Sequence, residues 1–535
     1  MQKKKWMVVL ALLISLVICL LMRWPQIVGL WQQWFEKGNG NGEAAVQLNV
    51  YLVAKESGGK NEQYRYTEYA LGEFMALQTG YREDGYIYKA MLEEYQKENS
   101  VELIIEHFDY SDDLHAQLVE DKKEGKLPDL IIEDSISFDD AYALLDADIL
   151  LDLSSYVQED GLYDSGEYYN EVLQGGQYKG QQMILPLSFN MNTIMSSTES
   201  LERYNIDLSE AGLLDMLVQF TSQLHMMQQE DPQQELLAQF VAAEGDFPIR
   251  ILLAAGGGTL VDYEEKKVQL DPEFYKEMAE FYKQFAIQEM GSLDAVIEQG
   301  TYLGLYQSVH GKRMGTAMRF EDMYRNTAAF IEGGSCSNIF IHSFAAQANY
   351  YESVYTDVGE EFCLYGIPTY ENSDEYTPMI TSFGAIMANT EHPEAAYDFL
   401  KYMMDQPYFM HYELSVNRQA TEEMLDQLSN TTYQLSQMRG YFENMSDSEL
   451  SIDYVMSPLT EDTKQKILYL LDNMGKATLS NWPVYQIVQE NMLLYVLDKC
   501  SIEESYEKCR KELNEYLNTF SLEGQLHDLI GYDYQ

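Results

Sequence analysis

Residues that could carry out catalysis are abundant in this sequence, but they do not form a catalytic pattern. Asp and Glu together number 87, so pairs of acids are inevitable, and the sequence alone does not say which two face each other as glycoside hydrolysis requires. The eight histidines are scattered, with no H-E-x-x-H zinc motif and no G-x-S-x-G nucleophile. No G-x-x-x-x-G-K-[ST] or G-x-G-x-x-G phosphate-binding loop occurs. We therefore expect a protein that is not an enzyme and uses no cofactor.

Metal ligands and disulfide partners also lack a recognisable spacing. No C-x-x-C pair occurs, and Cys500 and Cys509 would lie on opposite faces of a helix, so we expect no bridge between them. The four cysteines beyond the N-terminal segment are interpreted as small buried residues: Cys336, Cys363, Cys500 and Cys509. Asp109, Asp112 and Asp113 could approach calcium, but the twelve-residue EF-hand pattern is missing. We expect no metal site.

Length and charge narrow the class of protein further. The chain has 535 residues, enough for two large lobes plus an additional segment, and its 46% hydrophobic content is that of a globular protein with a sizeable core. The formal net charge is −52, and such a surface repels phosphate backbones. Nucleic acid is therefore excluded as an expected partner.

The N-terminus has the features of a membrane address. Three lysines precede an apolar run over 6–22 that would span about 25 Å as a helix, and Arg23 follows it. Lysines before the run place the N-terminus in the cytoplasm and the rest of the chain outside. Cys19 stands where a bacterial lipoprotein carries its lipidated cysteine, but Ile18 replaces the usual small residue. Cleavage and lipidation stay open as alternatives, and we favour an uncleaved anchor.

After this segment, strands and helices alternate. Expected strands cover 46–53, 101–108 and 130–132, and an expected helix covers 114–123. This order predicts a mostly parallel sheet with helices on both faces. Glu133, Asp134 and Ser135 follow the third strand at its carboxyl end, where open α/β sheets bind ligands. They are candidate ligand-binding residues, although an ordinary solvated acidic turn would have the same sequence.

The second half of the sequence is richer in helix. Helices are expected over 213–225, 234–243, 272–285 and 393–404, and a strand over 380–387. Pro483 favours a helix start at its own position, and Ser501 with Glu504 forms a capping box that opens the next helix. We expect that last helix to bury one stripe of residues: Ile502, Tyr506, Cys509, Leu513 and Leu517.

Several segments together resemble one protein family. Residues 125–131 read G-K-L-P-D-L-I, 178–186 contain Y-K-G and a later proline, and 257–262 read G-G-T-L-V-D. Residues 311–318 contain G-K and A-M, and 392–396 read H-P-E-A-A. In this order the motifs are similar to those of the bacterial extracellular solute-binding proteins of family 1, the carbohydrate-type receptors of ABC importers. The resemblance extends from about Val46 to Leu517.

The resemblance implies a fold and a division of the chain. The expected class is α/β, a periplasmic-binding-protein-like type II fold whose two lobes enclose a ligand cleft and are joined by hinge crossovers, preceded by an N-terminal membrane helix. Residues 1–42 would be the anchor and linker. Residues 43–187 with 365–415 would form lobe I, and 188–364 with 416–535 would form lobe II.

The resemblance also implies a function. Such a protein is the extracellular substrate-binding component of an ABC importer, a monomer that binds a carbohydrate and delivers it to the permease subunits. An oligosaccharide is favoured, with monosaccharide, peptide and polyol left open because cleft dimensions are not encoded in any motif. The alternative function is a membrane-tethered ligand sensor or adhesion module that uses the same fold without transport.

Further candidate ligand-binding residues come from positions in the resembled motifs. Trp482 could stack on a sugar ring, with Asn481 and Tyr485 beside it, or it could instead cap a core layer. Asn190 lies just past the crossing strand and could bind ligand or simply bond at the strand end. The remaining candidates are Arg319, Glu321, Ser382 and Phe383.

Overall fold

The computed structural model describes part of the chain. The described residues are 46–53, 95–96, 98–108, 111–134, 141–203, 205–230, 252–253, 260–290, 340–342, 348–405, 414–430, 433–434, 455–479 and 481–522. The expected membrane segment 1–42 lies outside these ranges, as do the expected helix 234–243 and residues 257–259 of the G-G-T-L-V-D motif. Across the described residues, no helix is both long and apolar enough to cross a membrane.

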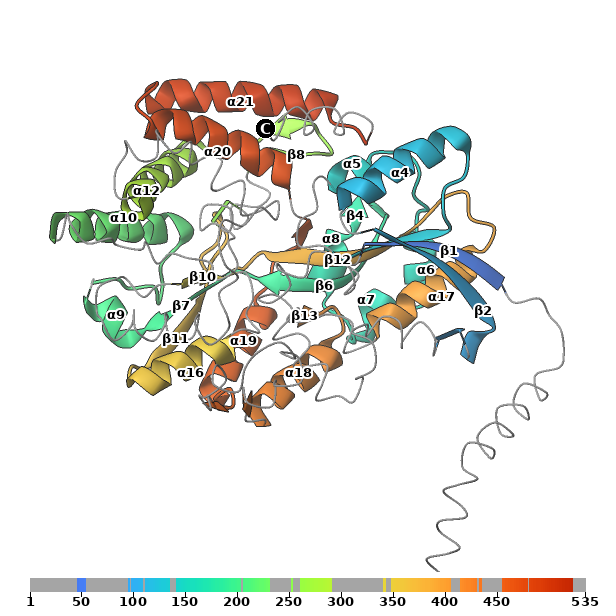
Figure 1. Ribbon diagram of the computed structural model, residues 1–535, viewed down its shortest axis with the longest axis horizontal. Coiled ribbons are helices and arrows are strands. Elements are labelled where there is room, and N and C mark those ends of the chain that lie inside the picture. The colour runs from blue at the N-terminus through green and yellow to red at the C-terminus, as the bar shows by residue number, and fades with distance from the viewer. Residues whose placement is uncertain are drawn as a thin grey trace, which may run out of the picture. The chain divides into compact units, whose positions relative to one another are not determined.

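A seven-stranded sheet forms the largest layer (Figure 1). Its strand order is β13 (Leu414–Ser415), β6 (Leu185–Met191), β12 (Pro378–Ile386), β3 (Leu130–Asp134), β1 (Val46–Val53) and β2 (Val101–Phe108), with β16 (Thr478–Leu479) pairing β12. The strands expected over 46–53 and 101–108 are confirmed, and the third extends two residues further than expected.

The expectation of a mostly parallel sheet is wrong. β1 runs parallel to β3, but β12 lies between β3 and β6 and is antiparallel to both. β12 comes from a distant part of the chain and does not follow β3 through a helical crossover, so the rule that favours parallel neighbours does not apply to it. At Thr381 the register between β12 and β6 shifts, which leaves Thr381 and Ser382 opposite Ser188.

Helices cover both faces of this sheet, as expected. α4 (Ser111–Glu124) lies on the face of Tyr51, whose hydroxyl donates to Asp121 Oδ2 at 2.6 Å. α17 (Pro393–Met404) covers the opposite face, where Leu400 packs directly over Gly384. The buried stripe of α17 consists of Ala396, Tyr397, Phe399, Leu400, Met403 and Met404.

A second sheet has three antiparallel strands. β7 (Thr193–Ser197) is central between β10 (Phe340–His342) and β11 (Phe362–Gly366). Asn192 alone separates β6 of the large sheet from β7 of the small one, and residues 367–377 connect β11 back to β12. The two connections run side by side, since Gly366 pairs with Thr193 and Pro378 pairs with Met191. Around the small sheet lie α9 (Thr198–Arg203), α16 (Ala348–Val358) and α19 (Glu461–Asp472).

Four helices and a hairpin form a further packed group, called the helical group below. The helices are α10 (Leu213–Glu230), α12 (Pro272–Met290), α20 (Trp482–Val496) and α21 (Ile502–Thr519), and the hairpin is β8 (Val261–Asp262) with β9 (Lys267–Val268). α20 and α21 pack side by side (Figure 1). The expected capping box is confirmed: Ser501 Oγ accepts from the Glu504 amide, and Glu504 accepts from the Ser501 amide.

Two expectations in this group need correction. On α21 the residues that line the buried face are Ser505, Cys509, Leu513 and Leu517, because Ile502 and Tyr506 are only half-buried. Cys500 is half-buried as well, whereas Cys363 and Cys509 are buried and free.

The remaining elements are α5 (Ala141–Leu145), α6 (Ser154–Glu159), α7 (Leu162–Ser165), α8 (Asn170–Gly175), β4 (Gln177–Tyr178), β5 (Gln181–Gln182), α18 (Arg418–Asn430), β14 (Tyr433–Gln434) and β15 (Val455–Met456).

Candidate functional site

Glu133, the next-to-last residue of β3, carries a fully buried carboxylate. Its side chain is 0% exposed, and Oε1 lies 2.7 Å from Nε2 of His115 on α4. The other carboxylate oxygen, Oε2, is buried without a hydrogen-bond partner in the described part of the chain. An unpaired buried acceptor is costly, and an ordered water or a ligand hydroxyl would satisfy it. The position at the carboxyl end of a sheet strand fits the ligand-binding interpretation of the sequence.

Asn190 lies near the end of β6, two residues before the crossing to β7. Its side chain is 1% exposed, and neither Oδ1 nor Nδ2 has a hydrogen-bond partner among the described residues. A carboxamide offers two donors and one acceptor, so all of its bonding capacity is left unused. The structure shows no side-chain hydrogen bond of Asn190 to the strand end among the described residues, and its role in ligand binding stays a prediction.

Thr478 on β16 is a third polar side chain of this kind, and no sequence motif indicated it. Met379 of β12 pairs with Asn190 on one side and with Thr478 on the other, so the two polar residues occupy one row across three strands. Side chains in one row lie on the same face of a sheet, about 10 Å apart when one strand separates them. Thr478 Oγ1 is buried and lacks a partner in the described part of the chain. We call Glu133, Asn190 and Thr478 the unpaired polar set.

Three hydroxyls lie next to Asn190, at the irregularity in β12, whereas Glu133 faces α4. Ser188 Oγ is 2.7 Å from Thr381 Oγ1 and 3.0 Å from Ser382 Oγ, and all three side chains are buried. Ser382 was expected from the sequence, whereas Ser188 and Thr381 were not, because only the register shift brings both β12 residues opposite Ser188. Phe383 is fully buried between β3 and β6 and belongs to the core.

The three candidates at the start of α20 have different positions in the helix. Asn481 caps the helix: its Oδ1 accepts from the Tyr263 hydroxyl at 2.5 Å and from the Val484 amide at 3.4 Å. Tyr485 is buried one turn into the helix. Trp482 is the first residue of the helix, and Pro483 follows it in the first turn, where proline is favoured. Asn481 thus serves the helix end, which is a structural role.

The remaining ligand-binding candidates from the sequence are Asp134, Ser135, Arg319 and Glu321. Asp134 pairs through its backbone with Ser382. Ser135, Arg319 and Glu321 lie outside the described residues, as do Asp109 and Cys336. Within the described ranges, no three His, Cys, Asp or Glu side chains gather as a potential metal site.

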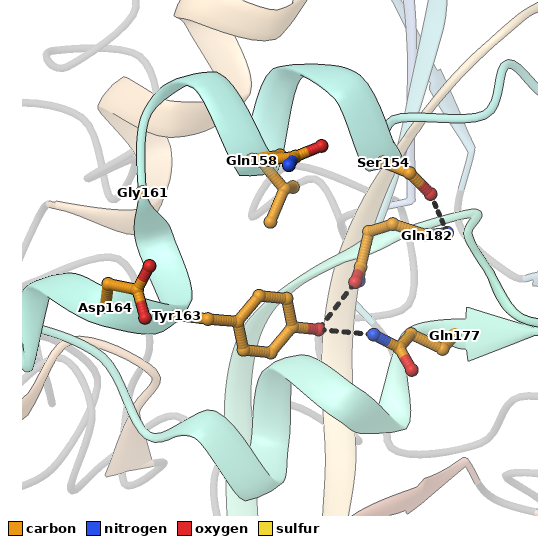
Figure 2. Close-up of a pocket in the computed structure, with 8 residues that line it drawn as sticks. Ser154, Gln158, Gly161, Tyr163, Asp164, Gln177 and Gln182 are labelled. Atoms are coloured by element: carbon orange, nitrogen blue, oxygen red, sulfur yellow. Dashed lines mark hydrogen bonds between the residues drawn. The ribbon is translucent and has the colours of Figure 1, made fainter.

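A small pocket lies elsewhere, between α6, α7 and the β4–β5 hairpin (Figure 2). The hydroxyl of Tyr163 donates to Gln182 Oε1 and accepts from Gln177 Nε2, each at 2.8 Å. Burial raises the pKa of Tyr163 to about 12, and the bond from Gln177 opposes part of that rise. None of the residues expected from the sequence to bind ligand lines this pocket. Its polar groups bond to one another, which distinguishes it from the unpaired polar set.

Comparison with known proteins defines the class of the molecule. The family model described as bacterial extracellular solute-binding protein matches residues 90–412, more than half of the chain. The chain therefore belongs to the bacterial extracellular solute-binding proteins, whose members bind solutes and do not transform them. No curated protein sequence matches the chain.

Solved structures of sugar-binding proteins share the fold of this chain. The sugar-binding protein MalE from the phytopathogen Xanthomonas citri is 12% identical, with a TM-score of 0.50 over 88% of this chain and 98% of that chain. CpMnBP1 with mannobiose bound is 13% identical, and CpMnBP1 with mannotriose bound is 14% identical. Both give a TM-score of 0.50 over 88% of this chain and 100% of theirs. At such low identity the similarity shows the fold alone, which is that of the periplasmic-binding-protein-like receptors.

Proposed function

We propose that this chain is the extracellular substrate-binding component of an ABC importer, and that it binds a carbohydrate at the carboxyl ends of β3 and β6. Residues 1–42 would hold the folded part at the outer side of the membrane, where permease subunits would receive the ligand. The protein would act as a monomer and would return its ligand chemically unchanged. An oligosaccharide is favoured, because the named structural relatives include complexes with mannobiose and mannotriose.

The observation that carries this proposal is the carboxamide of Asn190. Leaving one buried polar group unpaired costs about 1 to 3 kcal/mol, and Asn190 leaves both of its polar atoms unpaired. Such a cost is expected at functional sites, where a ligand supplies the missing bonds. A sugar hydroxyl both donates and accepts, so it matches the two donors and one acceptor of a carboxamide.

The other members of the unpaired polar set have the same complementarity. Glu133 Oε2 can only accept when ionised, and Thr478 Oγ1 can donate and accept. Polyhydroxylated ligands offer many donors at short spacing, whereas an apolar solute would leave all these groups unsatisfied. The unpaired polar set therefore favours a carbohydrate over an apolar ligand.

The two adjacent connections between the sheets would form part of a hinge between two lobes. One lobe would be built on the seven-stranded sheet, with residues 43–187 and 365–415. The other would contain the three-stranded sheet, with residues 188–364 and 416–535. The expected boundaries 187/188 and 364/365 fall inside β6 and β11, and the connections between the sheets lie a few residues further on, at Asn192 and at 367–377. Rotation about Asn192, about residues 367–377 and about the short link from β16 of the seven-stranded sheet to α20 would open and close the lobes on a ligand. Closure would give the permease a ligand-dependent shape to bind.

A thermal-shift screen of the full chain in detergent tests the proposal. Mannobiose, mannotriose, maltose and maltotriose are compared with short peptides, and a ligand at 100 times its dissociation constant should add about 2.7 kcal/mol of stability. Asn190→Leu should abolish the shift caused by the sugar. Without ligand this variant should melt at or above the wild-type temperature, because Leu removes an unpaired buried amide.

Asn491→Leu is the matched control. Asn491 is equally buried but fully bonded, since Nδ2 donates to Ile487 O at 2.9 Å and Oδ1 accepts from Lys508 Nζ at 3.0 Å. This variant should melt lower without ligand and keep the sugar-induced shift. A screen in which peptides shift the melt and sugars do not would refute the carbohydrate assignment. Silence of every ligand would favour the sensor or adhesion alternative.

A further inference from the structure

An aromatic contact joins α5 to the β8–β9 hairpin. Both elements are far in the sequence from the two connections between the sheets. The rings of Tyr142 on α5 and Tyr263 just after β8 are stacked, with centroids 4.0 Å apart and planes 8° from parallel. About 120 residues separate the two tyrosines along the chain, so the contact is tertiary and not local. Stacked pairs of this kind add attraction beyond simple burial.

The α5 side of the contact is fixed to the seven-stranded sheet. The segment after α5 bonds to the end of β12, since the Ala388 amide donates to Ile149 O at 2.8 Å. Asp146, one residue after α5, accepts from the Tyr178 hydroxyl at 3.0 Å and from Lys179 Nζ. Movement of the large sheet would therefore carry Tyr142 with it.

The hairpin side is fixed to the helical group. The Tyr263 hydroxyl donates to Asn481 at the start of α20, and the Tyr263 ring meets Phe520 after α21 edge-on at 5.2 Å. The Tyr506 hydroxyl on α21 donates to Leu270 O just after β9, at 2.9 Å. Movement of the helical group would carry Tyr263 with it.

A second, polar contact joins the same two parts. Lys266 Nζ in the hairpin turn lies 3.8 Å from Asp146 Oδ2, while Asp146 also binds Lys179. Burial alone would raise the pKa of Asp146, but the bonds from Lys179 and Tyr178 hold that pKa below its ordinary value. Asp146 is thus a charged carboxylate at neutral pH and can attract Lys266.

We propose that Tyr142, Asp146, Tyr263 and Lys266 form a latch that holds the helical group against the seven-stranded sheet and parts when the two move about the crossings. The latch consists of one stacked ring pair and one ion pair between exposed Lys266 and half-buried Asp146, 3.8 Å apart, which is a small contact compared with a permanent domain interface. Such a contact can open without unfolding either side. The latch would set how readily the protein opens, and it goes beyond the proposed function because it requires no particular ligand.

Hydrogen exchange of the full chain in detergent, followed by mass spectrometry, tests the latch without any ligand. Tyr142→Ala should speed exchange about threefold or more in a peptide covering 260–269, which lies on the opposite side of the contact. Tyr142→Phe keeps the ring and should exchange like the wild type. An effect confined to the peptide 141–147 would mean a purely local role and would overturn the proposal.

Two further variants keep the test decisive. Tyr156→Ala removes another tyrosine pair, Tyr156 with Tyr397, that lies between α6 and α17, and it should leave the 260–269 peptide unchanged. Lys266→Asn suits the left-handed backbone at that turn, where φ is 50°, and should speed exchange of the 141–147 peptide. If neither Tyr142→Ala nor Lys266→Asn affects the opposite peptide, the latch does not exist. Failure of sugar binding would leave this result intact, so the two proposals fail separately.

Discussion

His115 Nε2 lies 2.7 Å from Oε1 of Glu133, and both side chains are buried between α4 and the seven-stranded sheet. The pair links a helix to the strand end that we assign to ligand binding. Buried polar pairs of this type are strongly destabilising when one partner is removed, because the other remains desolvated and unpaired. His115 therefore holds Glu133 in position and offsets the cost of burying its carboxylate.

Removing His115 alone should be more harmful than removing both members of the pair. His115→Phe should lower the free energy of unfolding by about 3 kcal/mol, because it leaves the Glu133 carboxylate buried without a partner. His115→Phe combined with Glu133→Met should lose less than the sum of the two single changes. Urea unfolding of the three variants measures this coupling. Additive losses would show that the two side chains do not stabilise each other.

A methyl group at Gly384 should disrupt the packing of α17. A Cβ there would lie 2.3 Å from Leu400 Cδ2 and 3.2 Å from Leu400 Cγ, and Leu400 is fully buried, so its whole side chain would have to repack. Gly384→Ala should therefore cost about 1 to 3 kcal/mol, the usual range for overpacking a core. Gly212→Ala is the control, since its nearest atom would be 3.9 Å away. The explanation fails if both substitutions shift the thermal midpoint equally.

Stability should decrease at alkaline pH through buried tyrosines. Burial raises the pKa of Tyr163 to about 12, and burial likewise raises the pKa of Tyr95 and of Tyr370 to about 12. A raised folded-state pKa means that the folded protein keeps its protons longer than the unfolded chain. The stabilisation is therefore complete below pH 10 and is lost as pH rises from about 10 toward 12.

Tyr163→Phe isolates one contribution to this alkaline decline. The variant lacks the ionisable hydroxyl, so its free energy of unfolding should fall less steeply between pH 10 and 11.5 than that of the wild type. At pH 7 it should be less stable, because Gln177 and Gln182 lose their common partner. Denaturant titrations at a series of pH values measure both effects. Identical slopes for variant and wild type would contradict the assignment.

Local elements of the fold could be predicted from the sequence because each encodes its own pattern. The strands over 46–53 and 101–108, the helix starting at Pro393 and the capping box at Ser501 all rest on periodicity or on turn chemistry within a few residues. The position of β12 between β3 and β6 could not be predicted in the same way. It depends on contacts of β12 with segments about 250 and about 190 residues earlier in the chain, which leave no local pattern.

The candidate site shows the same limit. Glu133 follows a strand end that the sequence marks clearly, and Asn190 follows a recognisable crossing motif. Thr478 becomes a candidate only through its place in one row with Met379 and Asn190. Asn481 stands beside a tryptophan and resembled a ligand residue, yet a helix start next to a proline needs a cap, and that need explains it.

Calorimetric titration of the wild-type chain with mannotriose, maltotriose and a tripeptide tests the central claim most directly. The account predicts saturable one-to-one binding of a sugar, and loss of that binding in Asn190→Leu while Asn491→Leu retains it. Binding of a sugar that survives Asn190→Leu unchanged would contradict the proposed site. Binding of the tripeptide with no heat from either sugar would contradict the carbohydrate assignment itself.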